Sequence, residues 1–314
     1  MDYRHVPVMV EEVIAYLGCM PGKTYVDGTL GGGGHAKAIV QHIEPNGFLV
    51  GIDKDPAALA VVSESLRGYA SRIELFNDDF AHAPHIVAER CGGKVDGILL
   101  DLGLSLYQLE GSGRGFSFRR DEPLDMRMNP KQEHTASHIV NRFSRGQLAE
   151  IISGYGEERW AGRIADAIVN ARRSRPIDSS LAFAEVVKTA IPAKHRPKRI
   201  HPATRTFQAI RIAVNREIGS LKAFLDGAAD LLNPNGRLCV ISFHSLEDRM
   251  VKQQFKHMAD PCRCPPDFPL CTCGKKPQVR ILTKKPVRPN PNAVEVNPMA
   301  RSAKLRVVEK LSGV

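Results

Sequence analysis

Short apolar runs alternate with helical patterns along the first hundred residues of the chain. Runs rich in β-branched and aromatic residues predict strands at 24–27, 48–53, 72–76 and 95–101. Between them, apolar residues recur at the spacing of one helix face and predict helices at 36–42, 56–69 and 83–91. Strands that alternate with helices are typical of βαβ units, so a parallel sheet is expected.

This alternation stops after Asp101. A segment rich in Gly, Arg and Pro at 105–130 is followed by helical patterns over 134–192, including a predicted helix at 155–171. A further helix is expected to start at Thr204. Because no strand pattern interrupts this region, we interpret it as a helical insertion in the sheet domain.

The strand pattern returns near the end of the chain. Buried strands are predicted at 237–243 and 304–308, with an irregular stretch rich in Pro, Lys and Cys at 261–298 between them. The predicted organisation is therefore a sheet domain in two parts, interrupted by an insertion that recognises the substrate. The three parts are 1–109, the helical insertion 110–200, and 201–314 with its cysteine-rich loop.

Composition narrows the class of protein and its partners. Of 314 residues, 44 are Lys or Arg and 34 are Asp or Glu, a net charge of +10. With 43% hydrophobic and 25% charged residues, the chain resembles an average globular protein, which excludes a disordered tail and a coiled coil. The basic excess favours an anionic partner such as nucleic acid. Charges at Asp2 and Arg4 argue against a secretory signal, and the apolar runs are short, so a cytoplasmic protein with no membrane partner is expected.

A glycine-rich loop follows the first predicted strand and precedes a helix. It runs from Asp27 through four consecutive glycines at 31–34 to His35. Glycines there let a ligand approach the amides of a helix N-terminus, and Asp53, at the end of the second strand, is placed to bind a ribose. A tight turn made for packing is the alternative. The acids argue against that alternative, and we predict a nucleoside-type cofactor.

Two cofactor classes fit such a loop. The pattern Gly31-x-Gly33-x-x-Ala36 matches the dinucleotide fingerprint, which is a weak signal by itself. The carboxylate of Asp27 would repel a pyrophosphate but can face a cationic methionine group. This favours S-adenosylmethionine over NAD. The predicted fold class is therefore α/β, a Rossmann-like S-adenosylmethionine methyltransferase sheet with an inserted helical domain.

Several long segments of the chain resemble one family, the RsmH (MraW) 16S rRNA cytosine-N4 methyltransferases. The matching segments include HVPVM (5–9), DGTLGGGGH (27–35), GIDKD (51–55), DLGLS (101–105) with Gln108, RGFSF (114–118), PLDMRM (123–128), YGEER (155–159), HPATRTFQAIR (201–211) and ISFHSLEDR (241–249). They span nearly the whole chain. The resemblance implies S-adenosylmethionine-dependent methylation of N4 of one cytidine in the decoding region of small-subunit rRNA.

The resemblance also implies which residues bind the cofactor. Carried over position by position, these are Gly33, Gly34, His35, Asp53, Phe80, Asp101 and Gln108. Phe80 would lie by the adenine and Asp53 at the ribose. Without the resemblance, Phe80 reads as a core aromatic and Gln108 as a solvated loop residue.

Asp101 is the first candidate for a catalytic residue, because open α/β sheets place their chemistry at the carboxyl ends of strands. The exocyclic amine of cytosine is a poor nucleophile, so the site must hydrogen-bond it and later take a proton. His35 is the second candidate, and a cap or a cofactor contact is its plainer reading. Ser242 and His244 are expected at the same edge of the sheet.

Basic and aromatic residues in the insertion are candidates for binding RNA. The predicted substrate-binding residues are Arg114, Phe116, Phe118, Arg127, Arg211 and Asn215. The basic stretch 194–199 is a further candidate, with a solvated surface as an equal alternative. The expected partner is small-subunit rRNA, naked or in the assembled small ribosomal subunit. The sequence leaves the oligomeric state open, with a homodimer as one option.

Four cysteines crowd near the end of the chain. Cys262, Cys264, Cys271 and Cys273 form two C-x-C pairs, which could bind a structural zinc ion, although paired zinc ligands usually have two or more residues between them. Free thiols and a redox role are the alternatives. For the whole chain, a nicotinamide oxidoreductase and a non-catalytic RNA-binding protein remain as rival functions, and both fit the acids Asp27, Asp53 and Asp101 less well.

Overall fold

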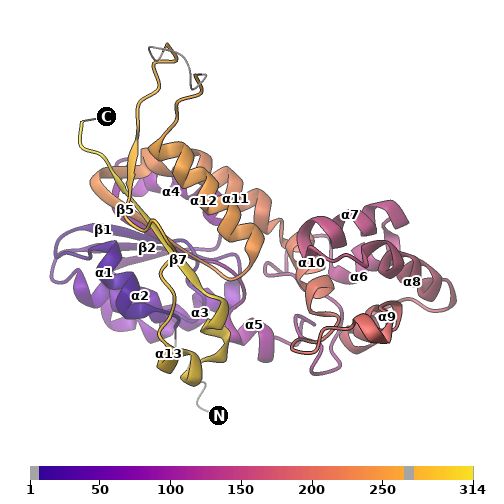
Figure 1. Cartoon of the computed structure of the whole chain (residues 1–314). Coiled ribbons are helices and arrows are strands. Elements are labelled where there is room, and N and C mark those ends of the chain that lie inside the picture. The colour runs from indigo at the N-terminus through magenta and orange to yellow at the C-terminus, as the bar shows by residue number, and fades with distance from the viewer. Residues whose placement is uncertain (1–6, 265–271, 314) are drawn as a thin grey trace. The chain divides into compact units, whose positions relative to one another are not determined.

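The computed structural model describes residues 7–264 and 272–313, which form two compact units (Figure 1). The first unit contains residues 1–103 and 218–314, and the second is Leu104–Glu217. The second unit is thus an insertion into the first. Among the described helices, none combines the length and apolar character needed to cross a lipid bilayer.

A sheet with the strand order β3-β2-β1-β4-β5-β7-β6 is the centre of the first unit. Its strands are β1 (Thr24–Asp27), β2 (Phe48–Ile52), β3 (Ile73–Phe76), β4 (Val95–Asp101), β5 (Leu232–Ser242), β6 (Val279–Ile281) and β7 (Lys304–Lys310). Strands β1 to β5 pair in parallel, and β7 pairs antiparallel with both β5 and β6. This confirms the Rossmann-like α/β fold class, with a reversed strand added to the usual order.

Helices cover both faces of this sheet (Figure 1). The helices of this unit are α1 (Val10–Leu17), α2 (Gly34–His42), α3 (Pro56–Ser65), α4 (Ala83–Arg90), α11 (Glu217–Gly227), α12 (Ser245–Ala259) and α13 (Pro291–Val296). Side chains alternate between the two faces of each strand, so Leu99 packs with α1 and α2 while Ile98 and Leu100 pack with α4, α11 and α12. Strands buried on both faces explain the nearly unbroken apolar runs in the sequence.

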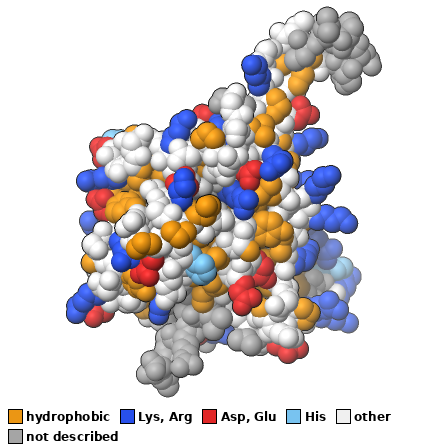
Figure 2. Space-filling model, turned by 90° about the vertical axis from the view of Figure 1, so that its left-hand side faces the viewer, with side chains coloured by type: hydrophobic (Ala, Val, Ile, Leu, Met, Phe, Trp, Pro, Cys, Tyr) orange, Lys and Arg blue, Asp and Glu red, His pale blue; other side chains and the backbone are white. Residues whose placement is uncertain are grey.

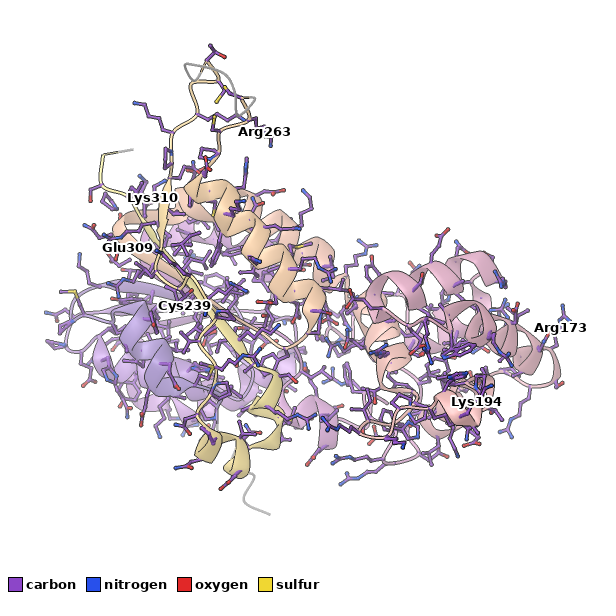
Figure 3. All side chains as sticks on the ribbon, viewed as in Figure 1. Arg173, Lys194, Cys239, Arg263, Glu309 and Lys310 are labelled. Atoms are coloured by element: carbon purple, nitrogen blue, oxygen red, sulfur yellow. The ribbon has the colours of Figure 1, made fainter. Side chains whose placement is uncertain are left out.

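The reversed strand β7 carries charged residues that are nevertheless buried, among them Arg306 and Glu309. Each has a partner: Glu309 accepts from Arg237 on β5 at 3.0 Å, and Arg306 Nε lies 2.7 Å from Asp248 Oδ1 on α12. Figure 3 labels Glu309 and Lys310 at the end of β7 and Cys239 within β5. Buried charges are tolerated here because they are paired and hydrogen-bonded.

The second unit is helical. It consists of α5 (Leu106–Glu110), α6 (Ala136–Arg142), α7 (Arg145–Gly156), α8 (Ala161–Ser174), α9 (Ser180–Ala190) and α10 (Thr204–Asn215). One core joins α6 to α10, with Leu148, Ile164, Ile168 and Phe183 fully buried in it. Since α10 contributes Phe207 and Ile210 to this core, the unit extends past residue 200, where the sequence places the end of the insertion.

The sequence-based prediction of elements is wrong at three places. The helix predicted at 155–171 is the end of α7 and most of α8, because Glu157 takes a left-handed conformation (φ 48°) that ends α7. The helix predicted at 56–69 ends at Ser65 and continues as a 3₁₀ turn, Arg67–Arg72. The stretch 261–298 is not irregular throughout, because β6 and α13 lie within it.

Candidate active site

The three acids singled out in the sequence lie at the carboxyl ends of neighbouring strands. Asp27 ends β1, Asp53 follows β2 and Asp101 ends β4. Strand β1 lies between β2 and β4, with Asp27 opposite Gly51 on one side and Leu99 on the other. The parallel register therefore brings the three carboxylates to one edge of the sheet.

Hydrogen bonds tie the glycine-rich loop to this edge. The amide of Gly31 donates to Asp53 Oδ2 at 2.8 Å, and the amide of Gly28 donates to the carbonyl of Leu99 at 2.9 Å. The hydroxyl oxygen of Thr29 accepts from the amide of Asp101 at 2.6 Å. Asp53 thus holds the loop, and its carboxylate retains lone pairs for a further donor such as a ribose hydroxyl.

Gly33 and Gly34 form the start of α2. Gly33 is the N-cap and has a φ of 78°, which favours glycine. A Cβ on Gly33 would lie 2.9 Å from Val62 Cγ2, and one on Gly34 would lie 2.5 Å from Pro7 Cγ. Packing within the protein therefore also requires glycine at both positions. The alternative of a packing turn, raised by the sequence, is part of the explanation of the loop.

His35 on α2 joins Asp27 and Asp101 in a buried cluster. His35 Nε2 lies 3.4 Å from Asp101 Oδ2, and His35 and Asp27 are 5% and 0% exposed. Burial raises the pKa of Asp27 to about 6. Burial acts to lower the pKa of His35, but the carboxylates of Asp101 and Asp27 outweigh it and raise that pKa. Both proposed catalytic residues therefore lie together.

Two carboxylate oxygens of this cluster, Asp27 Oδ2 and Asp101 Oδ1, are buried without a hydrogen-bond partner among the described residues. Asp27 Oδ1 accepts from the amide of Thr29, whereas Asp27 Oδ2 is buried without a hydrogen bond among the described residues. A buried, unsatisfied carboxylate oxygen is costly in a structural site. It indicates a site that is completed by a cationic or hydrogen-bonding ligand.

Phe80 lies beside a polar network that the sequence did not reveal. Its ring contacts Phe224 edge to face, and Lys54 Nζ lies 5.7 Å from the ring centre. Lys54 pairs with Asp79 at 2.8 Å, and the hydroxyl of Ser220 donates to Asp79. Ser220 is 141 residues from Asp79, so no local motif could have connected them.

Past the end of β5, His244 caps α12. Its Nδ1 accepts from the amide of Glu247, and its Nε2 lies 3.1 Å from Glu247 Oε1. Glu247 Oε2 in turn accepts from the amide of Phe243. Glu247 is buried, so this capping arrangement fixes the turn from β5 into α12.

In the second unit, Gln108 is a capping residue of α5. Its side-chain oxygen accepts from the amide of Ser105, whose hydroxyl accepts from the amide of Gln108. This capping box explains the residue type and its burial. The predicted cofactor contact of Gln108 stays a prediction.

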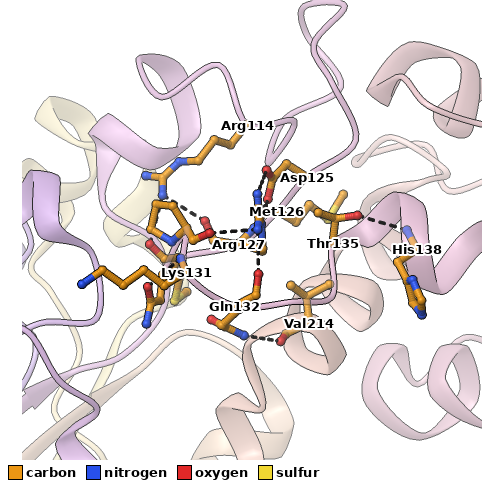
Figure 4. A network of polar contacts seen from close by, with 12 residues as sticks. Arg114, Asp125, Met126, Arg127, Lys131, Gln132, Thr135, His138 and Val214 are labelled. Carbon is orange, nitrogen blue, oxygen red and sulfur yellow. Dashed lines mark hydrogen bonds and ion pairs between the residues drawn. The ribbon is translucent and has the colours of Figure 1, made fainter.

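Arg114 and Arg127 hold a long loop in the second unit together (Figure 4). Arg127 makes two hydrogen bonds to the Asp125 carboxylate, both 2.8 Å, and donates to the carbonyls of Pro130 and Gln132. Burial acts to raise the pKa of Asp125, but Arg127 outweighs it and lowers that pKa. Arg114 donates to the carbonyls of Arg127 and Met128. These contacts shape the loop.

The other predicted substrate-binding residues also have partners inside the second unit. Phe116 is buried against Arg114, and Phe118 stacks on His201 at 4.4 Å. Arg211 pairs with Glu217 at 2.8 Å. Asn215 is 2% exposed, donates to the carbonyl of Met126 and accepts from the amide of Met128. These internal partners explain the residue types, and the RNA contacts expected from the sequence stay predictions.

Exposed cations lie elsewhere in the second unit. Arg119 and Arg120, which follow the RGFSF motif (114–118), are exposed, as are Lys194, Lys198 and Arg199 in the basic loop. Figure 3 labels Lys194 on the surface of this unit. In the first unit, Lys and Arg side chains gather along one edge of the face shown in Figure 2, where hydrophobic side chains form only small groups.

Comparison with known proteins gives the family. The profile described as "MraW methylase family" matches residues 2–311. The chain belongs to the MraW methylase family. A protein named "Ribosomal RNA small subunit methyltransferase H" from Desulfosudis oleivorans is 51% identical over 99% of this chain and 100% of its own length. Proteins of the same name from Geobacter sulfurreducens (51%, 99% and 100%) and Heliobacterium modesticaldum (48%, 99% and 100%) are similarly close.

The buried carboxylate of this MraW methylase should make stability depend on pH. Between the ordinary pKa of 3.8 and the raised value of about 6, the folded protein keeps a proton on Asp27 that the unfolded chain releases. The parent therefore loses on the order of 3 kcal/mol from this group as pH rises through that window. Asp27→Asn lacks this loss, so its unfolding free energy relative to the parent should increase over the window, as measured by urea unfolding. Asp226→Asn, at an exposed position, is the control. If the difference in unfolding free energy between Asp27→Asn and the parent did not change with pH across the window, the prediction would be contradicted.

Proposed function

We propose that this chain is an S-adenosylmethionine-dependent methyltransferase that methylates N4 of a cytidine in the decoding region of 16S rRNA. The observation that carries the proposal is the cluster of Asp27, His35 and Asp101 beside the glycine-rich loop. Family membership supports the reaction type, and the name of the relatives supports a small-subunit rRNA acceptor. Since that rRNA is cytoplasmic, the proposal places the chain in the cytoplasm.

The residues at the sheet edge fit a cationic nucleoside cofactor. Asp27 presents an unsatisfied buried carboxylate oxygen, as a cationic methionine group requires. Asp53 can accept from a ribose, and Phe80 offers an apolar surface for the adenine. The N-terminus of α2, from Gly34 onward, offers backbone amides, whereas the amide of Gly33 already donates to the carbonyl of Leu30 at 2.7 Å. When bound, S-adenosylmethionine supplies an electrophilic methyl group.

Asp101 is proposed to prepare the acceptor amine. The lone pair of the cytosine amine is delocalised into the ring, so a carboxylate that accepts its hydrogen bond raises its nucleophilicity. The same carboxylate can then take the proton that the amine loses. His35, 3.4 Å from Asp101 Oδ2, is proposed to orient that carboxylate and so acts as a positioning residue.

The second unit is proposed to recognise the RNA. Because Arg114 and Arg127 are used to shape their loop, we assign phosphate contacts to the exposed cations Arg119 and Arg120 and to the basic loop 194–199. The target base must be single-stranded or flipped to be reached. Arg114, Phe116, Phe118, Arg127, Arg211 and Asn215 then act by holding the recognition surface.

Undermethylated small ribosomal subunits and naked 16S rRNA are the acceptors for the first test. Incubation with S-adenosylmethionine should add one methyl group to a decoding-region cytidine, and mass spectrometry of the nucleosides should locate it on N4. Methylation of a different base, or NAD binding without S-adenosylmethionine binding, would overturn the proposal.

Asp101→Asn should slow turnover because the amide cannot take the proton. We expect kcat to fall at least about 100-fold, the low end for a positioned proton acceptor, with a smaller change in cofactor Kd. Asp96→Asn, at the opposite end of the same strand, is the matched control. Unchanged kcat in Asp101→Asn, with cofactor affinity intact, would rule out the proposed role.

Charge reversal tests the RNA contacts. Lys198→Glu with Arg199→Glu should weaken binding to 16S rRNA and flatten its salt dependence, because two phosphate contacts are lost. Cofactor Kd should stay unchanged. The control pair, Arg67→Glu with Lys94→Glu, reverses the same charge in the first unit, and an equal loss of RNA affinity there would show a non-specific charge effect.

A further inference from the structure

The segment between α12 and β6 brings three cysteines together. Cys262 and Cys264 follow α12, and Cys273 precedes β6. Their Sγ atoms all lie within 4.8 Å of one another, and those of Cys262 and Cys273 are 3.9 Å apart. Figure 3 shows Arg263, between the first two, on the part of the chain that projects from the end of α12. Cys271, the fourth predicted ligand, lies outside the described residues.

The spacing of these sulfur atoms matches a metal site. A disulfide requires sulfur atoms about 2.0 Å apart and would join only two of the three cysteines. In a tetrahedral zinc site with Zn–S bonds of about 2.3 Å, neighbouring sulfur atoms are about 3.8 Å apart. The distance of 3.9 Å between Cys262 and Cys273 agrees with that value. Convergence of three thiols from two sides of a loop is not required by packing, because Cys262 is exposed.

The surroundings favour bound thiolates. The hydroxyl of Thr272 lies 3.8 Å from Cys264 Sγ, an outer contact of the kind that orients metal ligands. Arg263, Lys275 and Lys276 are exposed neighbours in the sequence of the cluster. Their positive charges offset the excess negative charge of several thiolates on one divalent ion.

The position of the cluster separates it from the proposed chemistry. Helix α12 begins at the carboxyl edge of the parallel strands, just after β5, and runs back to the opposite edge. Strand β6 begins at that same edge. Its first residue, Val279, pairs with Lys310 of β7. The neighbouring Glu309 pairs with Arg237, where the regular pairing of β5 with β4 begins. The cysteines thus lie at the edge away from Asp27 and Asp101.

We propose that Cys262, Cys264 and Cys273 bind one Zn²⁺ ion that closes the loop between α12 and β6. The ion replaces the thiol protons, cross-links the two sides of the loop and takes no part in methyl transfer. Three thiolates leave one position of the tetrahedron for a further ligand. The role is structural, because the metal joins residues that follow α12 to a residue that precedes β6, at the edge of the sheet away from the proposed chemistry.

Metal analysis tests this inference independently of the methylation reaction. The full chain, reduced and incubated with ZnCl₂, then dialysed, should retain about one zinc per chain by mass spectrometry of the metal. Cys262→Ser and Cys273→Ser should lose it, while Cys91→Ser, outside the cluster, should keep it. Cobalt loading of the parent should give the absorption of tetrahedral thiolate coordination, and this should disappear in Cys273→Ser.

Two outcomes would overturn the proposal. One is equal zinc retention by the parent and by the triple variant Cys262→Ser, Cys264→Ser, Cys273→Ser. The other is a Cys262–Cys273 disulfide in protein kept under reducing conditions. It would appear in the peptide map, and the intact mass would be two hydrogens below that of the chain with all thiols reduced. Circular dichroism and S-adenosylmethionine binding of each variant check that the remainder of the chain is folded, so a general loss of structure is distinguished from loss of the metal.

Discussion

The parallel pairing of β1 with β4 in the middle of the sheet is the constraint on which the site depends. It sets Asp27 opposite Leu99 and so places the ends of both strands at one edge. Two hydrogen bonds then join β4 to the loop that follows β1. The amide of Gly28 donates to the carbonyl of Leu99, and the amide of Asp101 donates to the hydroxyl oxygen of Thr29. The glycine-rich loop therefore has a defined position before any ligand arrives, which lowers the entropic cost of binding.

Charge at this edge is used in two different ways. Asp53 and Asp79 are satisfied by amides, a hydroxyl and Lys54, and they hold loops. Asp27 retains an unsatisfied buried oxygen, and Asp101 faces His35. Burying such groups costs stability whether or not they are hydrogen-bonded, because burial raises the pKa of both Asp27 and Asp53 to about 6. The stability lost there is consistent with a site built for a cationic ligand.

The second unit shows why basic residues cannot be assigned by charge alone. Arg114 and Arg127 are partly buried and donate to carbonyls of one loop, whereas Arg119 and Arg120 are exposed although both contact Glu110. Arginine serves both purposes because its planar group can bind several carbonyls or one phosphate. The choice between these uses depends on which carbonyls the fold brings near.

The sequence alone indicated six of the strands, the glycine-rich loop, the three acids and the family, because apolar periodicity and contiguous motifs are local properties. It missed the short strand β6 and the first residues of β5. Tertiary structure decided the break between α7 and α8, where Glu157 turns the chain, and the network of Lys54, Asp79 and Ser220. It also decided that Asn215 faces inward and that three cysteines converge. These features depend on contacts between residues distant in the chain or on burial, which no local pattern encodes.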